Sequence, residues 1–394
     1  MLFNHTINFR ELKAVLHHCY RNQRSLMIYG SSGIGKSAYI EAWTKNELHT
    51  DLLVDFRLCL EQVESIGGQW IPEDTEANGL AMIKALPEIW LPLLEEGVVG
   101  VLFLDELTSA SPAKQAIAYQ LLHDRKIGGR KISSKVLIVS AGNMLDSGGL
   151  VFELLKPVAN RVLQVEILGT GEEATKIYIE DFAIPANMNV AVIDYLENKP
   201  QNLNKNEEDS SCPAFPSQRS WYYTSTTLNE MEQGLLPQKL GWKIIGGYIG
   251  ESYARDFKMH YAIGEGMPNI KSILNGKMPQ LADDATYQQK AYVLSCCASM
   301  WKMMFVDKST PEQVLFDSFT NVVDWAQNNF SLQGTDRDNI TAFGKSVLDF
   351  LQGENRQELT GRSGFRLRLI KQAKGAAKLI MDWNNVKAEA GNMF

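Results

Sequence analysis

The residues with the clearest capacity for chemistry form a glycine-rich loop near the start of the chain. Gly30-Ser-Ser-Gly-Ile-Gly-Lys-Ser37 matches the pattern GxxxxGK[ST] in full. Glycines let backbone N–H groups surround phosphates without clashes from Cβ atoms, and the lysine places a cation beside the outer phosphates. A glycine turn that only joins a strand to a helix is the alternative. The strand-like run Ser25–Tyr29 directly before the loop argues against that alternative.

This loop predicts a ligand with β- and γ-phosphates that is bound together with Mg²⁺, and ATP is the expected nucleotide. The segment from Ala38 to Trp43 is compatible with a helix, and a helix N-terminus adds favourable partial charge near phosphates. Ser37 is the candidate metal ligand because its hydroxyl follows the lysine. The candidate nucleotide-binding residues are Gly30, Ser31, Ser32, Gly33, Ile34, Gly35, Lys36, Ser37 and Ala38.

Two adjacent carboxylates end a second apolar run, Val101-Leu-Phe-Leu-Asp105-Glu106. A buried strand delivers its last residues to the carboxyl edge of a parallel sheet, where ligands bind. Asp105 is therefore predicted to hold Mg²⁺ or its water, and Glu106 to act as general base toward an attacking water. Two acids on a solvated turn are the alternative. A small-molecule kinase with this loop needs no water-activating glutamate, so Glu106 favours hydrolysis.

Three further polar residues are candidates for the same reaction. Asn143 ends the apolar run from Val136 and is predicted to orient water or contact the γ-phosphate. Arg161 precedes another strand-like run and could reach a phosphate in a neighbouring subunit. Arg219 opens the helical half of the chain and could close over the nucleotide. The alternative for Asn143 is an ordinary turn after a strand. The alternative for Arg161 and for Arg219 is a surface salt bridge.

The pattern of apolar residues predicts the elements that must position these groups. Short runs rich in Val, Ile and Leu alternate with helix-compatible segments over the first 200 residues, which indicates an α/β fold: a parallel sheet with helices on both faces. The strand-like runs are Ser25–Tyr29, Leu52–Leu60, Val98–Leu104, Val136–Ser140 and Val162–Ile167.

Beyond residue 212 the pattern becomes helical. The predicted layout is a nucleotide-binding domain over 1–200, a linker over 201–212, a helical lid over 213–310 and a helical C-terminal extension over 311–394. Three apolar stripes at helical spacing support it: Ile245, Ile249, Tyr253 and Phe257; Leu315, Phe319, Val322, Ala326 and Phe330; and Ile340, Phe343, Val347 and Phe350.

Composition narrows the class of protein. The 394 residues are 45% hydrophobic and 22% charged with a net charge of -7, which is ordinary for a globular chain and argues against coating nucleic acid through bulk positive charge. No apolar run approaches the length of a membrane span, and Met1–Arg10 lacks the apolar core of a signal peptide. Five cysteines without metal-ligand spacing indicate reduced thiols, so a cytoplasmic location is expected.

Taken in order, these motifs resemble those of AAA+ ATPases of the MoxR-like branch, including phage- and bacterium-encoded members. The resemblance covers about residues 8 to 300. Gly30–Ser37 is similar to Walker A and Leu102–Glu106 to Walker B. Ser140–Asn143 resembles sensor 1, Asn160-Arg161 the arginine finger, and Ser217–Trp221 sensor 2, with Gln218 standing where the family usually has proline. Cys59–Pro72 resembles the insert of this branch before Walker B.

The resemblance implies a magnesium-dependent ATPase that forms a ring, a hexamer, with each site at a subunit interface. It implies that Arg219 acts in cis and Arg161 in trans. It also implies a homo-oligomer that remodels a protein client; a von Willebrand A-type protein would be a separate partner, because this chain lacks the Asp-x-Ser-x-Ser motif. The expected location is the cytoplasm, or the host cytoplasm if the chain is phage-encoded.

Two other functions stay open on the sequence. One is a nucleic-acid motor or loader that uses the basic stretch Thr360–Met381, where Lys371, Lys374 and Lys378 share a helical face. The favoured interpretation of that face is a solvated helix surface. The other function is an assembly scaffold that is gated by ATP and turns over slowly.

Overall fold

The computed structural model describes residues 6–60, 62, 69–75, 79–144, 151–205, 214–330, 335–353 and 356–372. The chain divides into two compact units by its internal contacts. The first contains the chain up to Thr170, a short segment from Asn204, and Ser217–Arg219. The second contains Gly171–Leu203, Cys212–Pro216 and the chain from Ser220 onward.

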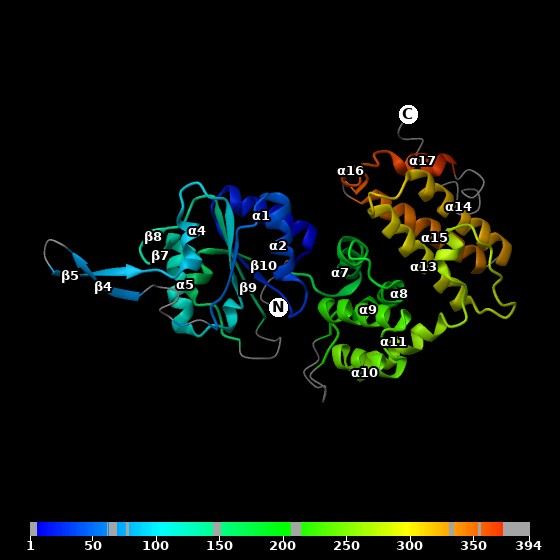
Figure 1. Cartoon of the computed structure of the whole chain (residues 1–394), viewed down its shortest axis with the longest axis horizontal. Helices are drawn as coiled ribbons and strands as arrows, with labels where there is room; N and C mark the ends of the chain where they lie inside the picture. Colours follow the sequence, from blue (N-terminus) through cyan, green and yellow to red (C-terminus); the bar gives the residue numbers. More distant parts are fainter. Residues whose placement is uncertain are drawn as a thin grey trace. The chain divides into compact units, whose positions relative to one another are not determined.

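The first unit is built on a six-stranded sheet in which all pairings are parallel (Figure 1). The strand order across the sheet is β1-β10-β2-β9-β6-β3. The strands are β1 (Thr6–Ile7), β2 (Ser25–Tyr29), β3 (Leu53–Arg57), β6 (Gly100–Asp105), β9 (Val136–Gly142) and β10 (Val162–Ile167). The five strand-like runs of the sequence are therefore confirmed, with end shifts of a few residues.

Helices cover both faces of this sheet, as the sequence predicts. The principal ones are α1 (Phe9–Arg21), α2 (Lys36–Glu47) and α5 (Pro112–Asp124). Alternate residues of a strand point to opposite faces. On β2, Leu26 and Ile28 pack with α1 and α2, whereas Met27 packs with α5. Both faces of β2 and β6 are buried, which explains why their sequences are continuously apolar.

Smaller elements connect the strands. A hairpin of β4 (Gln69–Thr75) and β5 (Gly79–Ala85) projects from the first unit in Figure 1, and β7 (Lys126–Ile127) pairs with β8 (Arg130–Lys131). The remaining pieces are η1 (Glu88–Trp90), α4 (Leu91–Leu94), η2 (Leu107–Ser109) and α6 (Lys156–Ala159). The β4–β5 hairpin overlaps the predicted insert Cys59–Pro72, most of whose residues before β4 lie outside the described residues.

The second unit consists of helices throughout its described residues. They are α7 (Gly171–Tyr178), η3 (Ile179–Ala183, a π-helix), α8 (Val190–Asn198), η4 (Pro200–Asn202), α9 (Gln218–Glu232), α10 (Gln238–Ile249), α11 (Glu251–Ile263), α12 (Ile270–Leu274), α13 (Tyr287–Val306), α14 (Glu312–Asn329), α15 (Thr335–Gln352), α16 (Arg356–Leu359) and α17 (Phe365–Gln372). The predicted α/β fold followed by a helical region is confirmed.

The predicted domain limits differ from these units. Helices α7 and α8 precede residue 200, yet they belong to the second unit because α8 packs against α13 and the side chain of Thr175 on α7 bonds to Pro200 in that unit. The predicted lid and C-terminal extension form one unit, since α13 packs against both α14 and α15. Residues 206–212 of the predicted linker lie outside the described residues.

Two of the three apolar stripes are confirmed and one is divided. The stripes on α14 and α15 are buried. The stripe from Ile245 to Phe257 keeps one helical spacing in the sequence, but Gly250 has φ 83° and separates α10 from α11. A positive φ in that range ends a right-handed helix, and glycine adopts it without strain. The four apolar residues therefore lie on two helices.

Part of the basic stretch Thr360–Met381 is structural in this fold. Arg362 is buried and donates hydrogen bonds to the carbonyl oxygens of Phe305, Asp307 and Thr310. Arg368 pairs with Glu312 at 2.7 Å. Lys374 and Lys378 lie outside the described residues. These two arginines therefore hold α17 and its preceding turn against the ends of α13 and α14.

The described residues bear on two expectations from the sequence, the state of the cysteines and the absence of a membrane span. The cysteines found there, Cys19, Cys59, Cys296 and Cys297, are free thiols. No helix among the described residues has the length and apolar character needed to cross a membrane.

Candidate active site

Three neighbouring strands end at the edge of the sheet that carries the candidate residues. Strand β2 leads into the glycine-rich loop, β6 ends at Asp105, and β9 ends at Gly142, next to Asn143. The pairing register sets Tyr29 of β2 opposite Gly142 of β9. Because all three strands are parallel and adjacent, their carboxyl ends meet, which is where open α/β sheets bind ligands.

The glycine-rich loop has the backbone that its sequence predicts. Gly33 and Gly35 have φ values of 75° and 96°, in the region that favours glycine. Helix α2 begins at Lys36, and no side chain caps its N-terminus. The first N–H groups of this 12-residue helix therefore face the loop without a side-chain acceptor, as expected of an anion site.

Gly33 is also held by the start of α9. A Cβ atom at Gly33 would lie 2.8 Å from Ser217 Oγ, which leaves no room for a side chain. The N–H of Arg219 donates to the carbonyl of Gly33 at 3.1 Å. The first turn of α9 thus contacts the loop directly, and Arg219 belongs to the same compact unit as the loop.

Lys36 lies inside the loop and is fully used in hydrogen bonds. Its Nζ donates to the carbonyls of Gly30 at 2.7 Å and Ser31 at 3.1 Å, and to Asn143 Oδ1 at 3.3 Å. The side chain is only 8% exposed. The ammonium group therefore rests on loop carbonyls and on the tip of β9.

The pKa of Lys36 is lowered to about 8, first by burial and to a lesser degree by the positive charge of Arg219, against the opposing negative charges of Glu106 and Asp105. Burial is the largest of these causes. A lysine with a depressed pKa beside a cation and two carboxylates is typical of a functional site. The same influence shows that Arg219 is electrostatically close to Lys36.

Ser37 and Asp105 form a pair of oxygen ligands suited to Mg²⁺. Ser37 Oγ donates to Asp105 Oδ2 at 3.1 Å, and Asp105 is 7% exposed. The Asp105 Oδ1 atom accepts the N–H of Glu106 at 3.0 Å. A hydroxyl and a carboxylate beside phosphate oxygens are the hard ligands that Mg²⁺ takes in nucleotide sites, so the residues present fit this ion.

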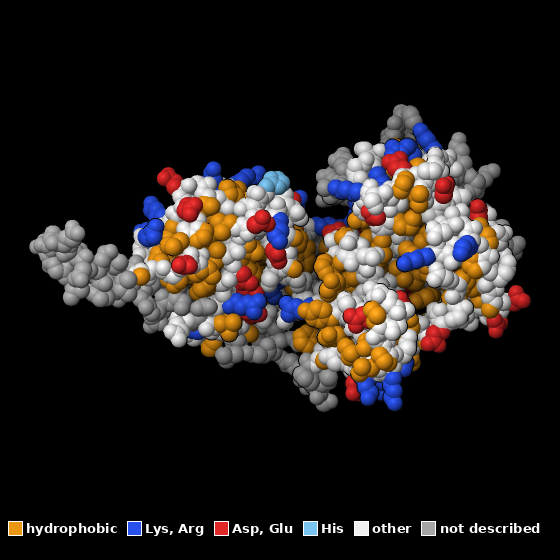
Figure 2. Space-filling model, viewed as in Figure 1, with side chains coloured by type: hydrophobic (Ala, Val, Ile, Leu, Met, Phe, Trp, Pro, Cys, Tyr) orange, Lys and Arg blue, Asp and Glu red, His pale blue; other side chains and the backbone are white. Residues whose placement is uncertain are grey.

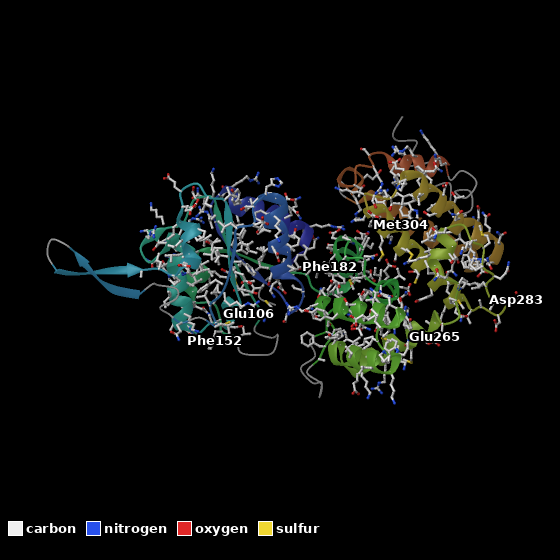
Figure 3. All side chains as sticks on the ribbon, viewed as in Figure 1. Glu106, Phe152, Phe182, Glu265, Asp283 and Met304 are labelled. Atoms are coloured by element: carbon white, nitrogen blue, oxygen red, sulfur yellow. The ribbon has the colours of Figure 1, made fainter. Side chains whose placement is uncertain are left out.

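Glu106 has an unusual backbone and a well-defined side chain. Its φ of 55° lies in the left-handed region, which costs a non-glycine residue about 1–2 kcal/mol. Its Oε2 atom accepts hydrogen bonds from Ser109 Oγ at 3.1 Å and from Asn143 Nδ2 at 3.3 Å. Glu106 and Phe152 are labelled in Figure 3, and the N–H of Phe152 donates to the carbonyl of Thr108, two residues after Glu106, at 2.7 Å.

Asn143 links the loop to the acidic pair. Its Oδ1 accepts from Lys36 and its Nδ2 donates to Glu106, so one amide bridges a cation and a carboxylate. Thr108 fixes the Asn143 backbone by accepting its N–H at 3.0 Å and donating to its carbonyl at 3.2 Å. A Cβ atom at Gly142 would lie 2.4 Å from Thr108 Oγ1, so this close approach requires glycine.

Arg161 lies apart from this cluster. Its Nη1 donates to the carbonyl of Pro157 at 3.0 Å, and its guanidinium carbon lies 4.8 Å from the centre of the Tyr119 ring. In the described part of the chain, no loop residue is among its contacts. The structure thus brings Lys36, Asp105, Glu106, Asn143 and Arg219 together and leaves Arg161 outside.

Gln218 occupies the first position of α9 without disturbing the helix start. Its Nε2 donates to the carbonyl of Gly169 at 3.0 Å, and its Oε1 accepts from Asn204 Nδ2 at 3.0 Å. The side chain is buried. These bonds fix the beginning of α9, and with it Arg219, next to the loop.

Thr108 and Ser109 contact Asn143 and Glu106, respectively, and were not predicted as site residues. Both lie in η2, the turn directly after the acidic pair. Two hydroxyl residues that follow the acidic pair after one leucine were the available signal, but Asn143, the partner of Thr108, is distant in sequence. Pairing of β6 with β9 brings them together.

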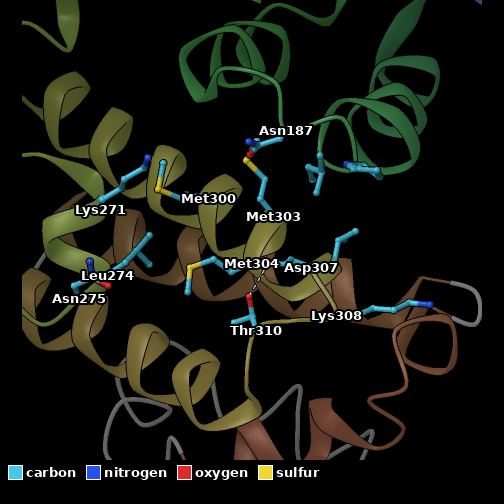
Figure 4. A pocket seen from close by; sticks show the side chains of 13 residues that line it. Asn187, Lys271, Leu274, Asn275, Met300, Met303, Met304, Asp307, Lys308 and Thr310 are labelled. Atoms are coloured by element: carbon cyan, nitrogen blue, oxygen red, sulfur yellow. Dashed lines mark hydrogen bonds between the residues drawn. The ribbon is translucent and has the colours of Figure 1, made fainter. Parts of the chain in front are cut away.

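A separate cavity of about 760 Å³ lies within the second unit (Figure 4). Met300, Met303 and Met304 of α13 line it together with Leu274 and residues near Asn187. Its one carboxylate, Asp307, has a lowered pKa because Ser309 donates hydrogen bonds to it. The cavity contains none of the residues of the glycine-rich loop.

Charge is mixed on the surface. On the face shown in Figure 2, Lys and Arg side chains lie among Asp and Glu side chains over both units, as far as the described residues extend. The face in view therefore has no broad basic area of the kind expected for a protein that wraps nucleic acid.

Comparison with known proteins gives distant structural likenesses. No family model matches the chain, and no curated protein sequence matches it. A RuvB mutant from Thermotoga maritima is 16% identical with a TM-score of 0.39, covering 68% of this chain and 74% of that one. A closed-state reconstruction of Hsp104 with ATPγS and casein is 15% identical with a TM-score of 0.35, covering 61% and 46%. The replication initiator DnaA bound to AMPPCP and single-stranded DNA is 14% identical with a TM-score of 0.33, covering 91% and 96%.

Each of these TM-scores is below 0.5, so the likenesses add nothing to what the topology gives. The parallel sheet and the GxxxxGK[ST] loop between β2 and α2 are those of a P-loop α/β fold, followed here by a helical unit.

Proposed function

We propose that this chain is an AAA+ ATPase of the MoxR-like branch, which binds ATP with Mg²⁺ and hydrolyses it to ADP and phosphate. The observation that supports this most directly is the bridge from Lys36 through Asn143 to Glu106. It puts a phosphate-binding cation, a polar sensor and a candidate base within hydrogen-bond reach of one another. Such a set serves hydrolysis of a phosphoanhydride better than transfer to a second substrate.

Binding would use the loop first. The backbone N–H groups of residues 30–38 would surround the β- and γ-phosphates, and Lys36 would exchange its carbonyl partners for phosphate oxygens. Mg²⁺, held by Ser37 and Asp105, would neutralise charge on the same phosphates. Arg219, fixed beside Gly33 by a backbone hydrogen bond, would add a second cation in cis.

Hydrolysis would follow by in-line attack of water on the γ-phosphorus. The water oxygen forms the new P–O bond, the bond to the β–γ bridging oxygen breaks, and Glu106 accepts the proton of the water. Asn143 would orient the water or the γ-phosphate through its amide. Lys36 and Arg219 would stabilise the charge that develops on the transferring group.

Arg161 would complete the site of a neighbouring subunit. Its position outside the cluster formed by the loop, Asp105, Glu106, Asn143 and Arg219 supports a role in trans. A homo-oligomeric ring, proposed to be a hexamer, would bring this guanidinium to the γ-phosphate of the next protomer. An arginine supplied in this way accelerates phosphoryl transfer by about 10³ to 10⁵ in other systems.

The energy of hydrolysis would remodel or activate a protein client in the cytoplasm, or in the host cytoplasm if the chain is phage-encoded. A separate protein with a von Willebrand A-type domain is the proposed partner. An assembly scaffold gated by ATP, with slow turnover, is the first alternative; assembly with almost no phosphate release would favour it.

A nucleic-acid motor or loader is the second alternative, and its proposed contact was the basic stretch Thr360–Met381. Among the described residues of that stretch, Arg362 is buried on three carbonyls and Arg368 pairs with Glu312. These arginines would have to abandon structural partners to reach phosphates. DNA-stimulated turnover that falls steeply with salt would nevertheless favour this alternative.

The proposed function is tested by phosphate release and by the melting temperature with and without ATP and Mg²⁺. We expect the wild type to release phosphate and to melt at a higher temperature with ATP, because a ligand of the folded state stabilises it by RT ln(1 + [L]/Kd). Lys36→Ala should lose both responses. A wild-type protein that neither binds nor hydrolyses ATP, or a Lys36→Ala variant that responds like the wild type, would refute the proposal.

A further inference from the structure

The turn η2 presents a hydroxyl to Glu106 that the proposed reaction has not used. Ser109 Oγ donates to Glu106 Oε2 at 3.1 Å. The other carboxylate oxygen, Oε1, has no hydrogen-bond partner among the described residues. Ser109 therefore restrains one oxygen of the candidate base and leaves the other available to accept a proton.

The second donor to Glu106, Asn143, also contacts Lys36 of the loop, whereas the side-chain hydrogen bond of Ser109 is with Glu106. Asn143 donates to Glu106 while its Oδ1 accepts from Lys36. If Lys36 turned toward bound phosphates, as the proposed function requires, Asn143 would lose that donor and its amide would be free to contact phosphate or water. Ser109 lies three residues from Glu106 in the same turn, so its hydrogen bond requires no contact with the loop.

The backbone around Glu106 is consistent with a restrained side chain. Its left-handed φ of 55° is a strained conformation of the kind retained at functional sites. The N–H of Ser109 donates to the Glu106 carbonyl at 3.0 Å and closes the turn. This backbone bond does not involve the Ser109 side chain, so the turn can persist when the hydroxyl is removed.

We propose that Ser109 is a positioning residue. It keeps the Glu106 carboxylate oriented toward the attacking water when Asn143 contacts the nucleotide. This inference rests on the proposed ATPase function. It assigns to Asn143 the response to the nucleotide and to Ser109 the constant restraint on the base. A small misplacement of a catalytic group is enough to reduce a rate by one to two orders of magnitude.

The test compares Ser109→Ala, Ser109→Thr and Ser111→Ala in steady-state phosphate release. Ser109→Ala should lower kcat about tenfold, with the KM for ATP and the ATP-induced rise in melting temperature changed by less than about twofold. Ser109→Thr keeps the hydroxyl and should retain at least about half of the wild-type kcat. Ser111 is a matched control, since it lies at the N-cap of α5 without a capping hydrogen bond.

A double-mutant cycle shows whether Ser109 acts through Glu106. In a Glu106→Gln background, Ser109→Ala should cause no further loss, because residues that act as a unit are not additive. A wild-type kcat in Ser109→Ala, an equal loss in Ser109→Thr, or a full additional loss in the Glu106→Gln background would overturn the inference. If the wild type hydrolyses ATP and Ser109→Ala does so equally well, only the inference fails. If the wild type has no ATPase activity, the proposed function fails as well.

Discussion

Lys36 offers a prediction whose magnitude follows from its burial. Burial lowers its pKa from 10.5 to about 8 in the folded protein without nucleotide. At about 1.4 kcal/mol per pH unit, this difference amounts to about 3 kcal/mol by which folding disfavours the charged lysine. Below pH 8 both the folded and the unfolded chain carry the charge, so the whole cost is present.

The sign of the pH dependence follows from proton binding. Between pH 8 and 10.5 the unfolded chain binds more protons at this lysine than the folded chain does, so the free energy of unfolding increases with pH. Integration with these two pKa values gives a gain of about 2 kcal/mol between pH 7 and pH 9.5. Lys36→Met keeps the length of the side chain and removes the titrating group, and with it this contribution.

The assay is urea unfolding of the wild type and Lys36→Met, without nucleotide, at several pH values from 7 to 9.5. Fluorescence of Trp43, buried on the same helix, contributes to the signal of the first unit. Comparing the two proteins cancels the titration of all other groups. We expect the wild type to gain about 2 kcal/mol relative to Lys36→Met over this range. A difference between the two that does not change with pH would refute the reasoning.

Two further predictions concern the packing of the site and its sharing between subunits. Gly142→Ala should lower the free energy of unfolding by about 1–3 kcal/mol, because its Cβ would lie 2.4 Å from Thr108 Oγ1. Gly247→Ala is the control and should not lower this free energy, because nothing lies within 4 Å of the added Cβ. Urea unfolding measures both, and a Gly142→Ala variant as stable as the wild type would contradict the packing argument. Arg161→Ala and Lys36→Ala should each be nearly inactive in phosphate release, and mixing them should restore part of the activity through interfaces with an intact loop and an intact arginine. No recovery in mixed oligomers that demonstrably form would exclude a shared site.

The sequence predicted the parts of the fold that depend on local pattern. The five apolar runs became strands because each is buried in the parallel sheet, and the GxxxxGK[ST] loop lies between β2 and α2 as expected. The break at Gly250 was missed because the apolar spacing of four continues across it. Spacing reports which side chains are buried and does not by itself show whether one helix or two carries them.

The sequence allowed the candidate residues of the site to be named, but not the hydrogen bonds that join them. Asp105, Glu106, Asn143 and Lys36 were identified from strand ends and from the loop. The role of Thr108 depends on the pairing of β6 with β9, a contact between segments far apart in sequence, and that of Ser109 depends on the conformation of the turn after Glu106. The boundary near residue 170, rather than 200, has the same origin, since α8 joins the second unit through its packing on α13.

The central claim, that Glu106 is the base of an ATPase, is tested most directly by single-turnover phosphate release from Glu106→Gln. The amide keeps the size of the side chain and removes its basicity. We expect the variant to retain the ATP-induced rise in melting temperature and to lose hydrolysis by at least about a hundredfold relative to the wild type. Hydrolysis by Glu106→Gln at the wild-type rate would contradict the account.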